Sequence, residues 1–408
     1  MKKEIIVVKF GGSSLSTPER IKNAALRVLS FKKKGKSPVV VVSAPGDTTD
    51  ELIKEARSIC KNPQEREMDM LLSTGEQKTI ALMAMALSRK RCKVISFTGH
   101  QLGILTDANY SNARIRSVSS HKLEDAIKNG YVVVVAGFQG MTEDGEITTL
   151  GRGGSDLTAI ALAATLSAEC KIFTDVEGIY TANPAVYKKA KKIDIITYDE
   201  MLEMASAGAT VMQARSVELA KNRDVSFEVA SSFKCTSGTL VCREDKLLEE
   251  LVVTNVTEDK NQIKITVVGV PDRPGIAAEI FTALADKNVC VDMIIQSAAK
   301  STPEGKAVNS ISFTVKKEDM EKAKKILRVI KKKLAAEDIL IENKVAKVSI
   351  VGSGMKTHSG VAARMFSVLA KNRINIEMIS TSEIKISCVI NEKSIEKAVK
   401  ALAEEFGL

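Results

Sequence analysis

The carboxyl-terminal part of the chain contains an internal repeat. The segment Gly275-Ile-Ala-Ala-Glu-Ile-Phe281 matches Gly360-Val-Ala-Ala-Arg-Met-Phe366, at an offset of 85 residues. Such a repeat constrains the fold before any single motif does, because both copies must form the same unit. Each copy is predicted to run strand, loop, helix, strand, strand, helix. The predicted elements are Ile265–Val270, Gly275–Asn288, Val289–Ser297, Ser310–Val315 and Glu318–Ala335 in the first copy, and Val348–Gly352, Gly360–Asn372, Ile374–Ser380, Lys385–Ile390 and Ser394–Phe406 in the second.

A ferredoxin-like βαββαβ unit needs one more strand per copy. The first copy has a candidate near Ile339–Val345, whereas the second copy reaches the end of the chain without one. A spare apolar segment, Leu251–Val256, precedes the first copy. We expect it to cross over and complete the second unit, so that the first unit is inserted within the second. The expected domains are 244–262 as linker and crossing strand, 263–345, and 346–408.

Residues 1–243 show a different pattern, in which short apolar runs alternate with amphipathic helical stretches. Strands that are buried on both faces and separated by helices indicate a mostly parallel sheet in a three-layer αβα sandwich. The predicted strands are Ile5–Val8, Val39–Val42, Val94–Phe97, Val132–Ala136, Ile172–Phe173 and Phe227–Val229, and the predicted helices are Ile21–Phe31, Met68–Leu87, Ser155–Ala168 and Tyr198–Lys221.

Composition excludes several classes of function. Aromatic residues make up only 4% of the 408 residues and Trp is absent, which argues against base-stacking surfaces for nucleic acid despite a net charge of +10. The seven cysteines form no C-x-x-C pair and the three histidines are far apart, so we expect reduced thiols in a cytoplasmic protein and no metal site of its own. We also expect no signal peptide and no membrane-spanning segment, because the apolar runs are too short.

The first predicted strand ends in Lys9-Phe10-Gly11-Gly12-Ser13-Ser14. Glycine N–H groups can approach an anion closely, and a lysine places positive charge at the carboxyl edge of the sheet, where α/β folds bind ligands. This pattern is typical of a phosphate site that is not a Walker loop. A tight turn with a solvated lysine is the alternative, and the residues alone leave both open.

Three further blocks carry chemistry. Gly151-Arg152-Gly153-Gly154-Ser155-Asp156 opens an Ala-rich helix, whose free N–H groups suit an anion, and Arg152 adds a fork for a carboxylate or phosphate. A capped helix is the simpler interpretation, although capping alone does not call for Arg-Gly-Gly. The segment from Phe173 to Pro184 is a turn-rich loop that could hold a nucleotide or be structural only. The block Ser73-Thr74-Gly75-Glu76-Gln77 places a glutamate early in a helix, where capping is the simpler role.

These four blocks, in this order and followed by the paired repeat, resemble the monofunctional aspartokinases of the amino acid kinase family, which carry two C-terminal ACT domains. The segments Val41–Ala44 and Val135–Gly145 also resemble family blocks. The resemblance covers essentially the whole chain. It implies transfer of the γ-phosphoryl group of ATP, supplied with Mg²⁺, to the β-carboxylate of L-aspartate.

The resemblance also implies roles for individual residues. Lys9 would contact the transferring phosphoryl group, Asp156 would orient Lys9, and Arg152 would grip a substrate carboxylate. Residues of the ATP site would be Lys9, Phe10, Gly11, Gly12, Ser43, Thr174, Asp175 and Tyr180, and those of the aspartate site Thr49, Glu76, Arg152, Gly153, Gly154 and Ser155.

By the same resemblance, the repeat would bind lysine, threonine or both as feedback effectors and would join the chain into a homodimer or larger assembly. The effector residues would be Asp272, Gly275, Ile276, Ala277, Asp292, Gln296, Ile374, Asn375, Ile376 and Thr381. A repeat that only dimerises the chain is the alternative.

The chain departs from the family pattern in places. Ala185 and Thr210 stand where basic nucleotide contacts are usual, so we expect a raised KM for ATP, and the segments around His100 and Tyr110 are also altered. Two alternatives follow: an amino-acid-sensing paralogue with weak kinase activity, and a kinase for another acidic amino acid. The joint retention of Lys9, Glu76, Arg152 and Asp156 favours an active kinase.

Overall fold

The computed structural model describes residues 4–209, 211–244, 252–301 and 307–408, which form two compact units. The first unit comprises residues 4–180, 192–205 and 211–244, and the second comprises 181–191, 206–209 and the described residues from 252 onward. Packing therefore assigns two short segments of the expected 1–243 domain to the second unit. The boundaries of the individual domains stay predictions.

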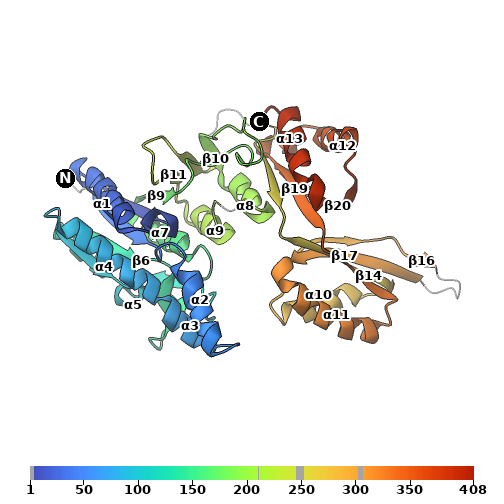
Figure 1. The fold of residues 1–408 in the computed structure, drawn as a ribbon, viewed down its shortest axis with the longest axis horizontal. Coiled ribbons are helices and arrows are strands. Elements are labelled where there is room, and N and C mark those ends of the chain that lie inside the picture. The colour runs from blue at the N-terminus through green and yellow to red at the C-terminus, as the bar shows by residue number, and fades with distance from the viewer. Residues whose placement is uncertain (1–3, 210, 245–251, 302–306) are drawn as a thin grey trace. The chain divides into compact units, whose positions relative to one another are not determined.

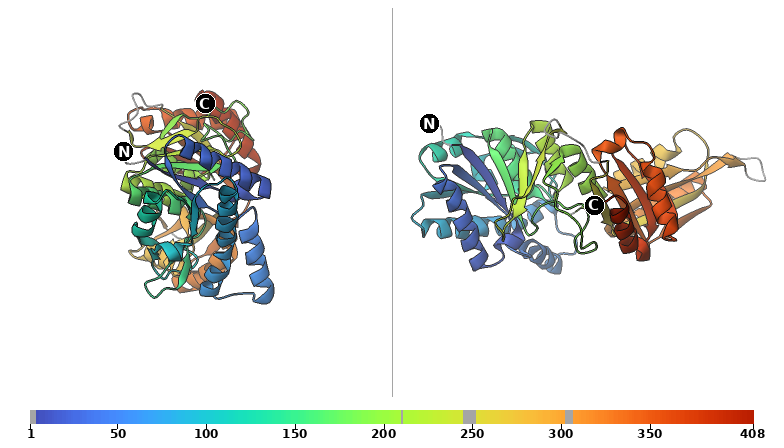
Figure 2. Two further views of the ribbon diagram at one scale, coloured as in Figure 1. Left: turned by 90° about the vertical axis from the view of Figure 1, so that its left-hand side faces the viewer. Right: turned by 90° about the horizontal axis from the view of Figure 1, so that it is seen from above.

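The first unit is built on an eight-stranded sheet, whose strands lie between helices (Figures 1 and 2). Of its described strand pairs only β11–β12 is antiparallel, so the predicted mostly parallel sheet is confirmed. The strand order is β10 (Ile195–Thr197), β12 (Thr239–Cys242), β11 (Phe227–Ser231), β9 (Glu169–Thr174), β1 (Ile5–Phe10), β2 (Ser37–Val42), β6 (Val132–Ala136) and β3 (Val94–Phe97).

The side chains of β1 point alternately to the two faces of the sheet, and each face is covered by helices. Ile6, Val8 and Phe10 pack into one apolar cluster with α1 (Pro18–Lys33) and α4 (Thr74–Ser88). Since successive side chains of a strand point to opposite faces, Lys9 lies on the other face, which α7 (Gly154–Leu166) covers. Helix α9 (Ala214–Arg223) packs against α7.

Two helices that the sequence predicts as continuous are each divided in two. The predicted Met68–Leu87 helix is α3 (Glu65–Leu72) followed by α4, and the carbonyl of Ser73 between them accepts a hydrogen bond from the side chain of Gln139 at 2.9 Å. The predicted Tyr198–Lys221 helix is α8 (Tyr198–Ala207) followed by α9, because Gly208 takes a φ of +123°, at which a helix cannot continue.

The first unit also has elements that the sequence analysis missed. A small second sheet has the order β5 (Ile115–Val118), β4 (Ile104–Thr106), β7 (Gln139–Met141) and β8 (Ile147–Thr149). Further helices are α2 (Thr48–Ile59), α5 (Gly99–Leu102) and α6 (His121–Lys128). Strand β8 matters most, because it leads directly into the Gly151–Asp156 block.

The second unit holds the two repeat copies, each a sheet with a pair of helices; in Figure 1, α10 and α11 lie together below β14 and β17. The first copy consists of β14 (Gln262–Pro271), α10 (Ile276–Ala285), β15 (Val291–Gln296), β16 (Lys300–Ser301), β17 (Ala307–Lys316), α11 (Met320–Leu334) and β18 (Asp338–Glu342), in the order β15-β17-β14-β18. The second consists of β19 (Val345–Val351), α12 (Val361–Lys371), β20 (Ile376–Thr381), β21 (Lys385–Asn391) and α13 (Ile395–Glu405).

The sheet of the second copy is completed by a strand that precedes the first copy in the chain. This strand, β13 (Asn255–Asp259), pairs antiparallel with β19 in the order β13-β19-β21-β20. It lies slightly later than the expected Leu251–Val256, of which Leu251 is outside the described residues. The first copy is therefore inserted within the second, and the ferredoxin-like topology is the same in both.

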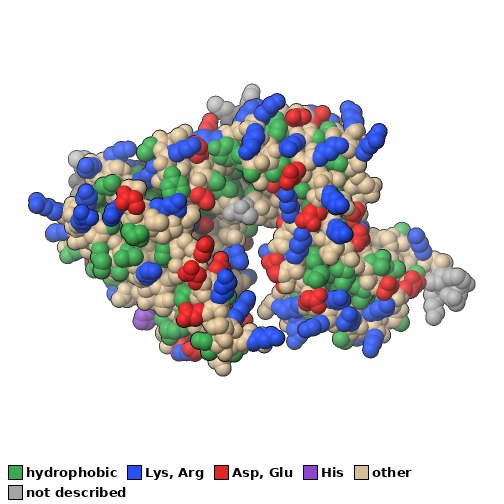
Figure 3. Space-filling model, viewed as in Figure 1, with side chains coloured by type: hydrophobic (Ala, Val, Ile, Leu, Met, Phe, Trp, Pro, Cys, Tyr) green, Lys and Arg blue, Asp and Glu red, His purple; other side chains and the backbone are tan. Residues whose placement is uncertain are grey.

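Charges of both signs are mixed on the surface. On the face drawn in Figure 3, Lys and Arg side chains are interspersed with Asp and Glu. Among the residues that the structure describes, no helix combines the length and apolarity needed to span a bilayer.

Candidate active site

Lys9 is a buried cation held by an acidic partner. Its Nζ lies 2.5 Å from Oδ1 of Asp156, and each residue is less than a tenth exposed. Asp156 lies in the first turn of α7, on the sheet face to which Lys9 points. The ion pair thus holds the ammonium at the carboxyl end of β1, between β2 and β9. This is the strand-end position at which α/β sheets bind ligands.

Of Gly11 and Gly12, only Gly12 leaves no room for a side chain. A Cβ at Gly11 would lie 3.5 Å from Nζ of Lys9, and a Cβ at Gly12 would lie 2.7 Å from the carbonyl oxygen of Ala44. Gly11 also donates a hydrogen bond to the carbonyl of Phe173 on β9 at 3.3 Å. The loop therefore needs Gly12 for close packing, whichever ligand it receives.

The start of α7 forms the next wall of the site. Gly151 and Gly153 have φ values of +77° and +70°, and a Cβ at Gly153 would lie 1.9 Å from the side chain of Gln213. Between them, Arg152 is exposed. The glycines turn the chain sharply into the helix, whose N-terminus carries a partial positive charge.

Glu76 is a buried carboxylate at the start of α4, only 3% exposed. Its Oε1 accepts a hydrogen bond from the backbone N–H of Ala44 at 2.8 Å, whereas the buried Oε2 has no hydrogen-bond partner among the described residues. Burial raises the pKa of Glu76 from 4.5 to about 7, with the bond from Ala44 opposing the rise. Such a carboxylate is suited to receive a cationic group of a ligand.

One cavity of about 730 Å³ brings most of the predicted residues together. Ser43 enters it directly after β2, and Thr49 from the first turn of α2. The predicted residues that line it are Lys9, Gly11, Gly12, Ser43, Thr49, Glu76, Arg152, Gly153, Gly154 and Ser155.

Five residues predicted for ATP or catalysis lie outside this lining: Phe10, Asp156, Thr174, Asp175 and Tyr180. Phe10 points into the core and stacks on Phe173, with ring centroids 5.0 Å apart, so only its backbone can meet a ligand. Thr174 ends β9, beside β1, and its hydroxyl lies 3.1 Å from the carboxylate of Asp175. Tyr180 is the last residue of its segment in the first unit. Asp156 reaches the cavity through its ion pair with Lys9.

The sequence analysis missed two charged residues next to this cavity, the first fully buried and the second half-buried. Asp69 on α3 and Arg215 on α9 both hydrogen-bond the backbone that leads to Arg152. One signal was available for Asp69: it lies on the buried face of a short amphipathic helix together with Leu72. Acidic residues are rarely fully buried without a partner, so this position indicated non-local donors.

The predicted effector residues fall on both repeat copies. Asp272 accepts a hydrogen bond from Asn309 at 3.0 Å, and Asp292 on β15 forms an ion pair with the fully buried Lys347 on β19 of the other copy. Gly275, Ala277, Gln296, Asn375 and Thr381 are exposed, Ile376 is half-buried, and the side chains of Ile276 and Ile374 are in the two apolar cores. Contact with an effector at the last two positions would therefore use the backbone.

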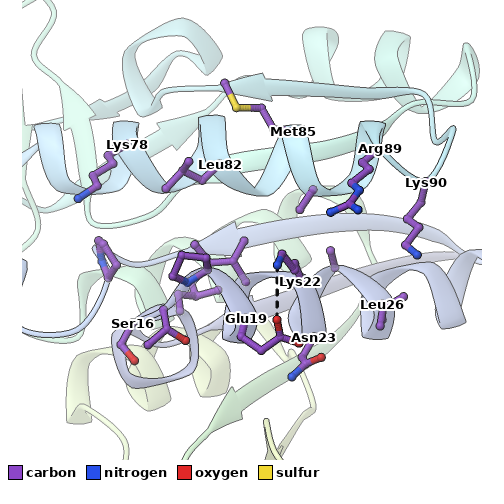
Figure 4. Close-up of a pocket in the computed structure, with 17 residues that line it drawn as sticks. Ser16, Glu19, Lys22, Asn23, Leu26, Lys78, Leu82, Met85, Arg89 and Lys90 are labelled. Atoms are coloured by element: carbon purple, nitrogen blue, oxygen red, sulfur yellow. Dashed lines mark hydrogen bonds and ion pairs between the residues drawn. The ribbon is translucent and has the colours of Figure 1, made fainter.

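A second cavity of about 670 Å³ lies between α1 and α4, and Figure 4 shows the two helices facing each other across it. Leu26, Leu82 and Met85 contribute apolar surface, and Lys78 and Arg89 add charge. The described residues that line it include none predicted for catalysis or binding. Elsewhere in the described part of the chain, no three His, Cys, Asp or Glu side chains are grouped so as to hold a metal ion.

Comparisons with known proteins agree with this arrangement. The amino acid kinase family model matches residues 4–231, and an ACT domain model matches 265–329 and 348–406. The chain is 49% identical to aspartokinase 2 of Bacillus subtilis over 405 residues, covering 99% of this chain and 98% of that protein, and 49% identical to an aspartokinase of Geobacillus stearothermophilus, covering 99% and 97%.

Solved structures give the same result. The fold matches that of aspartokinase III of E. coli in complex with aspartate and ADP, with a TM-score of 0.82, 26% identity and coverage of 99% of this chain and 100% of that one. With its kinase fold, its paired ACT units and its cavity of matching residues, the chain belongs to the amino acid kinase family and, within it, to the aspartokinases.

Proposed function

We propose that the chain transfers the γ-phosphoryl group of ATP to the β-carboxylate of L-aspartate, giving 4-phospho-L-aspartate. The observation that carries this proposal is the cavity in which Lys9, Glu76 and Arg152 converge. The related E. coli enzyme, aspartokinase III, has been solved with aspartate and ADP bound.

The reaction explains why the cavity needs no general base. A carboxylate has a reference pKa near 4 and is already ionised at neutral pH. The difficulty is to bring this anion onto a second anion, so the site must position both and neutralise charge. Lys9, held by Asp156, and the N-terminus of α7 supply positive charge where β1 ends.

The remaining charges fit the ends of an amino acid. Arg152 would bind the α-carboxylate of aspartate, and Oε2 of Glu76 would accept a hydrogen bond from the ammonium group. Binding the ammonium would favour the ionised form of Glu76 and so release a proton wherever that side chain was neutral.

ATP would enter from the side of β9, where Thr174, Asp175 and Tyr180 lie. Mg²⁺ would arrive with the nucleotide and neutralise charge on the phosphates. It usually keeps several waters and takes only one or two protein carboxylates, so it does not require a cluster of protein ligands. Asp175 is exposed beside β1 and is the residue that we assign to it.

The ACT pair would regulate this activity. Aspartokinase III of E. coli has also been solved with lysine and aspartate, at a TM-score of 0.76 to this chain and with 26% identity. We assign lysine, alone or with threonine, to the predicted effector residues, and a homodimer or larger assembly to the ACT units. A cytoplasmic location stays a prediction from the sequence.

The test is ATP-dependent formation of an acyl hydroxamate over a panel of acidic amino acids, with and without lysine and threonine. Aspartate should be the preferred substrate, and an effector should lower the rate. Preference for another acidic amino acid would favour the alternative kinase. Effector binding without turnover would favour the regulatory paralogue.

A further inference from the structure

Asp69 is a fully buried carboxylate that receives several donors at once. It accepts hydrogen bonds from the backbone N–H of Thr149 at 2.7 Å, from the Thr149 hydroxyl at 2.7 Å and from the backbone N–H of Ser111 at 2.9 Å. The Ser111 hydroxyl lies 3.3 Å from the same group. Within the described residues no Lys, Arg or His pairs with Asp69. Its burial is thus offset by donors from two segments that are 42 and 80 residues away.

Arg215, on α9, forms hydrogen bonds with the same two segments. Its guanidinium donates to the carbonyl of Leu150 at 2.8 Å, to Oδ1 of Asn112 at 2.7 Å and to the carbonyl of Ala113 at 2.8 Å. The acceptors of Arg215 are the neighbours in sequence of the donors to Asp69. Asn112 and Ala113 follow Ser111, and Leu150 follows Thr149. Because the guanidinium is planar, its three acceptors fix both the distance between the two segments and their relative orientation.

The two held segments are also joined to each other. The N–H of Ala113 donates to the carbonyl of Thr149 at 2.9 Å, and a Cβ at Gly151 would lie 3.0 Å from Oδ1 of Asn112. The loop that carries Arg152 leaves this anchored backbone at Gly151. Because the Arg152 side chain is exposed, packing around it does little to place it, and the anchored backbone sets where it starts.

We propose that Asp69 and Arg215 are positioning residues for the aspartate half of the site. They act through the backbone of Thr149 and Leu150, which aims the loop of Arg152 into the cavity. Ser111, Thr149 and Arg152 all line that cavity, whereas Asp69 and Arg215 do not. This inference rests on the proposed function, since it assigns the loop to aspartate rather than to ATP.

The proposal predicts that substitutions at these positions change the KM for aspartate but not the KM for ATP. Asp69→Asn replaces one carboxylate oxygen with an amide NH₂, which would face the donors of Ser111 and Thr149. Arg215→Lys replaces the planar guanidinium with a single ammonium, which cannot keep all three hydrogen bonds in the same geometry. Each should raise the KM for aspartate tenfold or more while the KM for ATP stays within about twofold, because displacement of a binding group by about 1 Å can cost 100-fold. Thr149→Val removes one of the hydrogen bonds to Asp69 at nearly constant volume and should have a smaller effect of the same kind.

Matched controls separate positioning from general destabilisation. Asp125→Asn and Arg116→Lys make the same changes at exposed sites of the same unit and should leave both KM values unchanged. A merely structural role would lower the thermal midpoint without this difference between the two KM values, or would raise both KM values together, and either result overturns the proposal. If Asp69→Asn fails to fold, Arg215→Lys and Thr149→Val decide the matter.

Failure of the proposed function is distinguishable. If the parent protein forms no acyl phosphate from aspartate and ATP, the proposed function is wrong. If the parent is active and the three variants retain its KM for aspartate, only the positioning role is wrong.

Discussion

Glu76 couples the stability of the empty site to pH. Burial raises its pKa from 4.5 to about 7, so the folded protein favours the neutral carboxyl. The stability that this neutral form contributes is present below about pH 4.5 and is lost as pH rises through 7. Since each pKa unit corresponds to about 1.36 kcal/mol, the loss above pH 8 is about 3 kcal/mol.

The variant Glu76→Gln keeps the shape of the side chain and removes its charge. It should therefore be more stable than the parent by up to about 3 kcal/mol above pH 8 and gain little at pH 5. For a unit of this size the gain corresponds to a rise of roughly 5–10 °C in the midpoint of thermal unfolding. The gain should come with a large loss of aspartate affinity, because the neutral amide cannot attract the ammonium.

The assay is thermal unfolding of parent and variant without ligand between pH 5 and pH 8.5. Glu55→Gln, at an exposed position of α2, is the control for removal of a carboxylate. A difference in midpoint between Glu76→Gln and parent that is the same at all pH values would refute the reasoning. As an independent check, calorimetry in two buffers should show proton release on aspartate binding near pH 6 and almost none at pH 8.5.

Other substitutions test the remaining features. Lys9→Ala should lower kcat by about 10²–10³ in steady-state assays with the fold intact by circular dichroism, and near-normal turnover would remove Lys9 from the mechanism. Gly153→Ala should lower both the thermal midpoint and aspartate affinity, because its Cβ collides with a neighbouring side chain at 1.9 Å. Gly130→Ala is its control: with a φ of +79° and no atom within 4 Å it carries the backbone strain alone, so equal losses in the two variants would contradict the collision. Asp292→Asn should lower the thermal midpoint more than Lys347→Met. The first variant leaves the ammonium of Lys347, only 1% exposed, without its acidic partner, whereas the second leaves only the carboxylate of Asp292, which is 42% exposed. The opposite order would show that the buried charge is not the costly one.

The sequence predicts the layers of the fold because local signals agree there. Buried apolar runs such as Val39–Val42 appear as central strands, and the glycine blocks appear at helix starts. The repeat also predicts that a strand preceding the first copy completes the second, although β13 starts four residues later than expected. Patterns of short range therefore carry most of this architecture.

Features that depend on distant partners could not be predicted in this way. The carbonyl of Ser73 receives a hydrogen bond from the side chain of Gln139, and the environment of Asp69 depends on donors from Ser111 and Thr149. Each partner lies at least 42 residues away, in a segment whose position only the folded chain determines. The cavity residues were found from motif resemblance, whereas the residues that brace them were not, because no motif includes both ends of such a contact.

The assignment of residues 181–191 to the second unit has a practical consequence for chimeric enzymes. Ala182 and Tyr187 are part of the apolar core of the second repeat copy, 2% and 8% exposed, although they precede that copy by more than 150 residues. A regulatory module cut out at residue 252 and transplanted to another kinase would leave a hole in its own core. Exchange of feedback control between relatives therefore requires that this segment travel with the ACT pair. The transplanted segment would then follow directly after Tyr180, a residue that we assign to nucleotide binding.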